Sequence, residues 1–425
     1  MVNPNSVLII KLRHHGDVLL TTPVARILKA HFPECSIDML VYEGTEALLE
    51  GNPDIDKIWS LNRKTKRWRK YYQQGCLLKE LSLRKYDWVI HLSDQMQGAF
   101  FSKFLAHKEA VGIDYPKRRN FLWRSCFTRL APLFTSNTRH TVEQNVQSLI
   151  SLGMDFSNEE VVGRLVINEH DRQVVKNLLD PFFDRIREEK NTNDEPLPYL
   201  VVHPASRWFF KCWEDDRFAE VIQYFADQGW PVIITSSPEE EEMKLVDSIL
   251  QKTKNLYSCS TEAANNFVAP VLEASSSFCT LNFCAPSTPC SSSASATMNR
   301  GSKTGSNSSR IISLAGQLTL QQLAALIEGA RLFVGVDSVP MHMAAMLQKD
   351  TVALFGPSKV NEWHPWRTCY HLINARDYGS LIDPDAVDTS TSHRYLSNIP
   401  VAPVIAAIEK VIATKEHKKT QKKET

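Results

Sequence analysis

The chain has 425 residues, of which 43% are hydrophobic and 23% are charged, and it carries a formal net charge of +1 at pH 7. A chain of this length and composition can form two globular domains, each with its own core. The near-neutral charge excludes a protein that is basic throughout, and the nine cysteines show no C-x-x-C spacing, which argues against a disulfide framework or a zinc site.

Alternating strand and helix patterns begin near the N-terminus. Residues 7–12 predict a buried strand, the apolar spacing of residues 18–28 predicts a helix, and residues 36–42 and 86–92 predict two further strands. Such alternation is typical of an open parallel sheet covered by helices. The N-terminal apolar run spans only residues 7–10, so we expect neither a signal peptide nor a membrane span.

The same alternation starts again in the second half of the chain. Strands are predicted at residues 199–202, 231–235, 311–314, 332–336 and 351–355, and helices at residues 215–228, 239–251 and 319–329. The charged segment 187–198 predicts a linker. We therefore expect two doubly wound domains that face each other across a cleft. They span residues 1–186 and 199–398, and a C-terminal helix with a lysine-rich tail follows at residues 399–425.

Residues 260–309 break this pattern. They contain 13 serines and three cysteines, only two acidic and two basic residues, and no sustained helix or strand period. This composition predicts a disordered insertion in the second domain, because little apolar surface is available for burial. A regulatory or partner-binding segment is the alternative interpretation.

Two strand ends in the second domain carry residues suited to an anion. Asp337, Ser338 and Pro340 follow the strand at 332–336 and begin a helix, whose free backbone N–H groups can hold a phosphate. The sequence H-P-A-S at 203–206, with Lys211 and Trp213, follows the strand at 199–202. An isolated D-S-x-P is typical of a capped core helix, but two strand ends facing one crevice favour a phosphate-bearing ligand.

The first domain contains two basic clusters. Residues 57–85 hold ten Lys and Arg against Glu80 alone, and residues 117–129 hold a second run of basic residues without an acid among them. Charge runs are often simply solvated faces, but two such clusters in a nearly neutral chain favour a multiply anionic partner. Trp68, Tyr71 and Tyr72 could stack on bases, yet no recognised nucleic-acid module accompanies them.

Four motifs together resemble the lipopolysaccharide heptosyltransferases of glycosyltransferase family 9. They are LIIKLRHHGDVLLTTP (residues 8–23), VHPASRWFFKCW (202–213), FVGVDSVPMH (333–342) and ALFGP (353–357). The resemblance covers nearly the whole chain outside residues 260–309. The element WFFKCW, the segment RHTVE at 139–143 and the tail at 377–400 resemble the heptosyltransferase III type in particular.

The resemblance implies a GT-B fold and an inverting transfer of heptose from ADP-heptose to the phosphorylated inner core of lipopolysaccharide. It implies that Asp17 is the general base, since a carboxylate at a strand-to-helix turn can take a proton from a sugar hydroxyl, although such carboxylates are also common helix caps. The implied donor-binding residues are Ser206, Lys211, Glu240, Glu242, Leu318, Asp337, Ser338, Val339 and His342. The implied acceptor-binding residues are Arg63, Lys64, Lys66, Arg67, Arg118 and Arg119.

Several points within this set stay open at the level of sequence. His342 could contact the ligand or could be a core histidine. The sequence also does not show which of the four glutamates at 239–242 would bind the ribose.

The other donor-side residues have expected roles. Lys211 would supply a positive charge for the departing diphosphate, and Ser206 would supply a hydroxyl beside it. Leu318 is expected against the adenine ring. Ser237 stands where the subfamily shows glycine, which is a departure on the nucleotide side.

We expect no metal and no cofactor, with ADP-heptose as a substrate, because neither domain offers a D-x-D pair or a cluster with metal-ligand spacing. The partners expected are the nucleotide sugar and the lipopolysaccharide core, with no nucleic acid. We expect a cytoplasmic protein, either free or in peripheral contact with the inner membrane surface. A nicotinamide dehydrogenase would need G-x-G-x-x-G after a strand, which is absent. A non-catalytic sugar-nucleotide-binding homologue, or transfer from another nucleotide sugar, remains an alternative.

Overall fold

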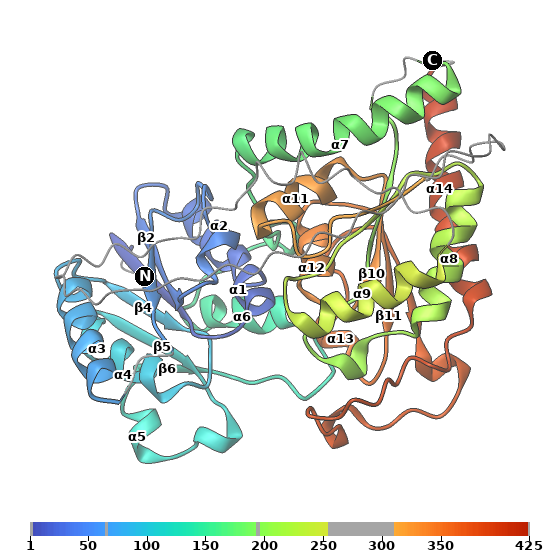
Figure 1. The fold of residues 1–425 in the computed structure, drawn as a ribbon. Helices are drawn as coiled ribbons and strands as arrows, with labels where there is room; N and C mark the ends of the chain where they lie inside the picture. The colour runs from blue at the N-terminus through green and yellow to red at the C-terminus, as the bar shows by residue number, and fades with distance from the viewer. Residues whose placement is uncertain (1–2, 64–66, 193–195, 254–309, 424–425) are drawn as a thin grey trace, which may run out of the picture.

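A computed structural model describes residues 3–63, 67–192, 196–253 and 310–423 (Figure 1). For the helical residues 67–70 and 415–423, it describes the backbone alone. The insertion expected at 260–309 lies outside the described residues. Among the residues that are described, no helix combines the length and the apolar character needed to cross a bilayer.

The N-terminal domain is built on a six-stranded parallel sheet with the order β3-β2-β1-β4-β5-β6. Its strands are β1 (Ser6–Lys11), β2 (Ser36–Tyr42), β3 (Lys57–Leu61), β4 (Trp88–His91), β5 (Glu109–Ile113) and β6 (Arg129–Ala131). The central strand β1 is buried on both faces from its second residue onward, which explains its unbroken apolar sequence.

The C-terminal domain repeats this topology with the order β12-β11-β10-β7-β8-β9, again all parallel. Its strands are β7 (Leu200–His203), β8 (Val232–Ile234), β9 (Ile311–Ser313), β10 (Leu332–Val336), β11 (Thr351–Phe355) and β12 (Tyr370–Asn374). Both orders are the Rossmann order, in which the direction of winding reverses beside the first strand. The predicted class of two doubly wound Rossmann-like domains is confirmed.

Helices cover both faces of each sheet (Figure 1). In the N-terminal domain they are α1 (His15–Leu19), α2 (Thr22–His31), α3 (Arg67–Ser82), α4 (Met96–Leu105), α5 (Phe121–Arg124) and α6 (Thr141–Ser151). The later helices are α7 (Glu169–Lys190), α8 (Asp215–Asp227), α9 (Glu240–Lys252), α11 (Leu320–Gly329), α12 (Val339–Met346), α13 (Val360–Trp363) and α14 (Val401–Lys423). The single helix predicted over 18–28 is in fact two helices, because α1 ends at Leu19 and Pro23 starts a new helical turn in α2.

Helix α7 lies before the domain boundary expected at residue 186, but it packs against the C-terminal domain. Arg172 of α7 donates to both carboxylate oxygens of Glu328 in α11, at 2.6 and 2.9 Å. The apolar face of α7 is buried in the same cluster as Tyr199 and the apolar face of α11. Residues 187–190, expected in the linker, form the last turn of α7. Local composition suggested the boundary, whereas the apolar stripe on α7 decides where the helix docks.

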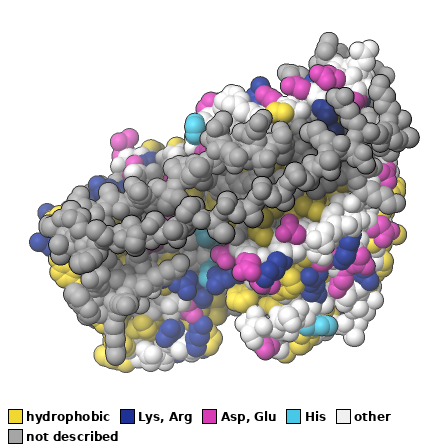
Figure 2. Space-filling model, in the orientation of Figure 1, with side chains coloured by type: hydrophobic (Ala, Val, Ile, Leu, Met, Phe, Trp, Pro, Cys, Tyr) yellow, Lys and Arg dark blue, Asp and Glu magenta, His cyan; other side chains and the backbone are white. Residues whose placement is uncertain are grey.

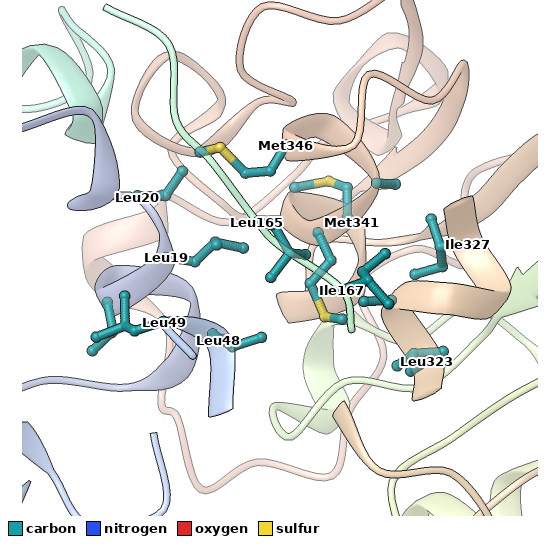
Figure 3. Packing of buried hydrophobic residues seen from close by; sticks show 14 of the residues in the cluster. Leu19, Leu20, Leu48, Leu49, Leu165, Ile167, Leu323, Ile327, Met341 and Met346 are labelled. Atoms are coloured by element: carbon teal, nitrogen blue, oxygen red, sulfur yellow. The ribbon is translucent and has the colours of Figure 1, made fainter. Parts of the chain in front are cut away.

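The two domains share one apolar core (Figure 3). Leucines from the N-terminal domain meet apolar residues from α11 and α12, and the chain that connects the domains passes between them. The contacting residues shown are Leu19, Leu20, Leu48 and Leu49 on one side, Leu323, Ile327, Met341 and Met346 on the other, and Leu165 and Ile167 between. Connecting residue Gly163 lies so close to Met346 that a Cβ there would stand 2.2 Å from the sulfur.

A polar contact between the domains forms at the start of α6. The backbone N–H of Val142 donates to Nδ1 of His140 at 3.1 Å, so the proton of the ring sits on Nε2, which donates to the carbonyl oxygen of His364 at 2.9 Å. The ring also stacks on Trp366, with centroids 4.6 Å apart. Burial lowers the pKa of His140 to about 3. The segment at 139–143 therefore serves to join the domains.

Candidate active site

The candidate site lies where the topology of each sheet reverses. In the N-terminal domain, β1 and β4 are neighbours; helix α1 after β1 carries Asp17, and the loop after β4 carries Asp94. In the C-terminal domain, β7 and β10 are neighbours, and the loops after them carry Lys211 and Asp337. Ligands of open α/β sheets bind at such points, outside the carboxyl ends of the strands. Figure 2 shows histidine side chains flanked by acidic and basic side chains where the two domains meet.

Two short helices bring the domains into contact at this point. A Cβ added to Gly16 of α1 would lie 3.3 Å from Cδ2 of His342 in α12 and 3.7 Å from a methyl group of Val339. Glycine at position 16 therefore allows the close approach of α1 to α12. The neighbouring Asp17 is thereby placed beside the start of α12.

Asp17 lies beside a buried cation. Its carboxylate is 3.9 Å from Nζ of Lys11, and the Asp17 side chain retains 21% of its exposure. Lys11 donates to the carbonyl oxygen of Leu92 at 3.0 Å and to the side-chain oxygen of Asn145 at 3.1 Å. Burial lowers the pKa of Lys11 to about 8, although the nearby Asp17 acts in the opposite direction. The N-cap residue of α1 is His14, so Asp17 lies in the first turn of the helix and is not its N-cap.

Acidic residues from outside the second basic cluster pair with it, although residues 117–129 themselves contain no acid. Asp94 forms ion pairs with Arg13, at 2.7 Å, and with Lys117. Arg118 donates to the carbonyl oxygen of Asp94 at 2.8 Å, and Arg119 pairs with Asp114 at 3.0 Å. The fold brings Asp94 in from the loop after β4, which linear spacing cannot reveal, whereas Asp114 lies just before the cluster in the same loop. Arg119 is therefore a weaker candidate for an acceptor phosphate than Arg118.

The first basic cluster is described only in part. Arg63 is exposed, and its guanidinium lies 4.9 Å from the ring centroid of Tyr42. Its charge acts on His14, whose pKa is lowered by burial and by Arg207 and Arg63. Arg63 thus stands on the same side of the site as Asp17. Lys64 and Lys66 lie outside the described residues, and Arg67 begins α3 with only its backbone described.

A tight ion pair marks the C-terminal side of the site. Nζ of Lys211 lies 2.5 Å from Oδ2 of Asp337, and the Asp337 side chain is only 5% exposed. Burial alone would raise the pKa of Asp337, but the Lys211 ammonium and His342 hold it below its usual range. Ser206 donates to the carbonyl oxygen of Asp337 at 3.4 Å. The loops after β7 and β10 are therefore tied together by one charged and one neutral contact.

Two polar groups at the start of α12 have no partner among the residues that the structure describes. Ser338 is the N-cap residue, but contrary to expectation its hydroxyl makes no cap hydrogen bond, and Oγ is buried without a partner among the described residues. Nδ1 of His342 is likewise buried and unpartnered there. Burial lowers the pKa of His342 to about 4, against the effect of Asp337, so the ring is neutral near pH 7. Unsatisfied buried groups of this kind are suited to a ligand.

The structure distinguishes the candidate ribose-binding glutamates at the start of α9, which the sequence could not tell apart. Glu240 points to solvent and pairs with Lys244 at 2.7 Å, with 81% of its side chain exposed. Glu242 is buried, and its carboxylate accepts a hydrogen bond from the backbone N–H of Ser237 at 3.0 Å. Leu318, in the loop before α11, is half-buried against the shared core. Of the two glutamates, Glu242 is the one whose carboxylate is held against the loop after β8.

Comparison with known proteins decides the family. The sequence model described as "Glycosyltransferase family 9 (heptosyltransferase)" matches residues 75–262 and 287–390. The chain belongs to glycosyltransferase family 9. Among family 9 relatives, lipopolysaccharide heptosyltransferase 3 of Escherichia coli is 30% identical over 402 residues, covering 94% of this chain and 97% of the relative. The predicted type III resemblance and the assignment as a glycosyltransferase enzyme are confirmed.

Solved structures of family 9 proteins have the same fold. A glycosyltransferase family 9 protein from Veillonella parvula superposes with a TM-score of 0.69 at 20% identity, covering 96% of this chain and 97% of that chain. Heptosyltransferase II of E. coli superposes with a TM-score of 0.64 at 17% identity, covering 97% and 99%. A third E. coli heptosyltransferase was solved with ADP-2-deoxy-2-fluoro heptose and superposes with a TM-score of 0.59 at 16% identity, covering 96% and 99%.

Three residues near the site were not predicted from the sequence: Arg13, Asp94 and Arg207. Membership of family 9 does not by itself identify them. Arg13 and Asp94 form the ion pair beside Asp17, and Arg207 reaches across to His14. Asp94 is the first acidic residue after β4, so the rule that ligands meet strand ends would have found it. No group of three or more metal-ligating side chains occurs within the described part of the chain.

Proposed function

We propose that this family 9 enzyme transfers heptose from ADP-heptose to the inner core of lipopolysaccharide. The observation that carries the proposal is the placement of Asp17 on one domain beside the Lys211–Asp337 pair of the other, at the contact between Gly16 and His342. The relative named lipopolysaccharide heptosyltransferase 3 and the E. coli heptosyltransferase solved with an ADP-heptose analogue support this substrate pair.

The C-terminal domain would hold the donor. Backbone N–H groups of Ser338 and Val339 at the start of α12 can meet the diphosphate, and Lys211 can balance its charge. The Asp337 carboxylate can accept hydrogen bonds from hydroxyls of the sugar. Because His342 is neutral near pH 7, it would act through a hydrogen bond from its free ring nitrogen rather than as a cation.

The nucleotide would extend from the diphosphate toward the loop after β8. Glu242 is the better candidate for the ribose hydroxyls, because its carboxylate is buried and held by the Ser237 backbone, whereas Glu240 is already paired on the surface. Ser206 can add a hydroxyl near the diphosphate. Leu318 would contact the adenine ring, since it offers the half-buried apolar surface in the next loop.

The N-terminal domain would supply the base. Asp17 would take the proton from the acceptor hydroxyl as its oxygen bonds to the anomeric carbon, while the bond from that carbon to the diphosphate oxygen breaks and ADP leaves. Attack from the face opposite the diphosphate inverts the anomeric configuration. Lys11 holds a positive charge 3.9 Å from the carboxylate, and its two hydrogen bonds fix the position of that charge.

Acceptor phosphates would be held by basic residues around Asp17. Arg63 is exposed on this side, and Arg118 extends from the loop after β5 to the Asp94 backbone. Lys64, Lys66 and Arg67 follow Arg63 in the sequence and would add positive charge, and Arg119 would contribute less because it is paired with Asp114. Positive charge in this position steers a multiply anionic acceptor to the site.

A transfer assay with ADP-heptose and a truncated lipopolysaccharide core tests the proposal. We expect a product with one added heptose, with an inverted anomeric centre by NMR, and an unchanged rate when a chelator is present. Donor binding without turnover, or transfer only from another nucleotide sugar, would refute the substrate assignment. Loss of transfer with a chelator and its rescue by magnesium would refute metal independence.

A further inference from the structure

Helix α4 is apolar on the side that faces solvent. Its buried face, which includes Phe101 and Leu105, packs in the N-terminal domain. The opposite face exposes Phe104 to 65% and Phe100 to 41% of their surfaces, with Lys103 between them. Helices of globular domains normally carry polar residues on the outer face. The exposed phenylalanines of α4 therefore need a partner outside the described fold.

The neighbouring helices extend this apolar surface on both sides. Tyr71 and Leu78 of α3 form, together with Phe100 and Phe104, an open groove with a volume of about 330 Å³. Helix α5 packs against α4 through the buried Trp123 and presents Phe121, which is 88% exposed. We call this surface, made by α3, α4 and α5, the aromatic face. Contiguous exposed apolar surface marks interaction sites.

The segment of the chain that forms the aromatic face is rich in basic residues. Residues 57–129, which contain its three helices, hold 17 Lys and Arg against five Asp and Glu, whereas the rest of the chain holds 32 against 43. Lys103 donates to the backbone oxygen of Ser125 rather than to a carboxylate, and Arg124 of α5 is exposed. At the lower edge of the N-terminal domain, Figure 2 shows hydrophobic side chains beside Lys and Arg side chains.

We propose that the aromatic face docks on an anionic phospholipid bilayer. Aromatic side chains would enter the boundary between headgroups and acyl chains, and Lys103 and Arg124 would meet lipid phosphates. Exposed aromatic residues interleaved with Lys and Arg are typical of surfaces that lie in this boundary. A protein partner would not explain why the segment that forms this face is basic in an otherwise acidic chain, whereas an anionic membrane does.

The aromatic face adjoins the acceptor side of the site. Arg118 lies in the short helical turn just before α5, and it donates to the backbone oxygen of Asp94, which pairs with Arg13 near Asp17. If the proposed function holds, docking would present Asp17 to an acceptor that is anchored in the same bilayer. The docking itself rests on the surface alone and is tested without any acceptor.

Vesicle flotation of the full-length chain tests the docking. We expect binding to vesicles of phosphatidylethanolamine and phosphatidylglycerol, and little binding to phosphatidylcholine alone. Replacing Phe104 and Phe121 together by Ser should lower the partition coefficient roughly ten-fold or more, because two largely exposed rings lose their apolar contacts. The Lys103→Gln, Arg124→Gln variant should bind anionic vesicles several-fold less tightly and with a weaker dependence on salt.

A matched control removes exposed apolar residues elsewhere. Ile150 is 49% exposed on α6 and Tyr378 is 39% exposed in the C-terminal domain, so the Ile150→Ser, Tyr378→Ser variant should bind as the parent does. Absence of parent binding to anionic vesicles, equal losses in both Ser variants, or binding to a single-stranded oligonucleotide in place of vesicles would overturn the proposal. Transfer to a soluble, acyl-free acceptor should persist in every variant, so its absence from the parent would count against the proposed function alone.

Discussion

Nδ1 of His14 in the N-terminal domain lies 3.1 Å from a guanidinium nitrogen of Arg207 in the C-terminal domain. The permanently charged guanidinium donates, so the imidazole accepts through Nδ1 and is neutral. His14 precedes Asp17 by three residues, and Arg207 follows Ser206 directly. This contact therefore joins the N-cap of α1, the helix that would carry the base, to the loop that would hold the donor. Neither residue of the contact needs to react.

The substitution Asp17→Asn should lower kcat by roughly 10² to 10⁴ while leaving the Kd for ADP nearly unchanged, because the amide keeps the shape but cannot accept a proton. Steady-state kinetics and ADP titration measure the two quantities. Asn caps a helix about as well as Asp, so a merely structural role would leave turnover near normal. Thermal melting of the variant controls for folding.

The substitution Lys211→Met should weaken ADP binding by roughly ten- to a hundred-fold, since a charge-assisted contact to the diphosphate is lost. It also leaves the buried Asp337 carboxylate unpaired and should lower the thermal midpoint. Lys244→Met is the matched control, because Lys244 pairs with the exposed Glu240. Isothermal titration with ADP compares them, and equal affinities in the two variants would contradict the assigned role of Lys211.

The substitution Arg63→Gln should raise the KM for the acceptor and reduce its dependence on salt, with the donor KM unchanged, because one exposed cation beside the site is removed. Arg119→Gln should have a smaller effect, since Arg119 is already paired with Asp114. Initial-rate measurements over a range of salt concentrations distinguish them. A larger effect at Arg119 than at Arg63 would reverse our assignment of the acceptor surface.

The buried His140 predicts an acid-sensitive fold. Its pKa is about 3 in the folded chain, well below the ordinary value, so the unfolded chain binds more protons between the two values. The free energy of unfolding should therefore decrease as pH falls below about 6.5, with a slope of up to about 1.4 kcal/mol per pH unit from this group. The contribution of His140 to the free energy of unfolding is fully present above the pKa of the unfolded chain, about 6.5. It is lost as the pH falls from there toward the folded pKa of about 3.

Urea unfolding of His140→Asn between about pH 6 and pH 4 checks this prediction, because Asn retains a helix cap but has no group that titrates there. The variant should be less stable overall and should show a shallower pH slope than the parent. His107 is exposed, so His107→Asn should retain the parent slope. A parent-like slope in His140→Asn would contradict the assignment.

The buried strands and the fold class could be predicted from sequence because central parallel strands are unbroken apolar runs. Strands β10 and β11 have the predicted bounds. Strands β5 and β12 begin with half-exposed or polar residues near the sheet edges, so no comparable run reveals them. The position of α7 depends on the packing of its apolar face against α11, and no local sequence pattern predicts which helices will pack together.

Within the site, residues in a local motif were easier to predict than residues brought in by the fold. Lys211 and Asp337 each follow a buried strand, and the structure pairs them directly. Arg207 has no local pattern that distinguishes it from a solvated arginine, and only the position of the other domain reveals its contact with His14. The ion pairs of Asp94 with Arg13 and Lys117 likewise depend on how the fold places segments that are distant in the sequence.

The apolar core that the two domains share has a consequence for how the chain can be divided. Interfaces between domains are usually polar enough to separate, but here leucines of one domain pack directly on methionines of the other. Expressed alone, each half would present this surface to water and would tend to aggregate. The two halves should therefore unfold in one calorimetric transition, and fragments cut between them should become soluble only when produced together.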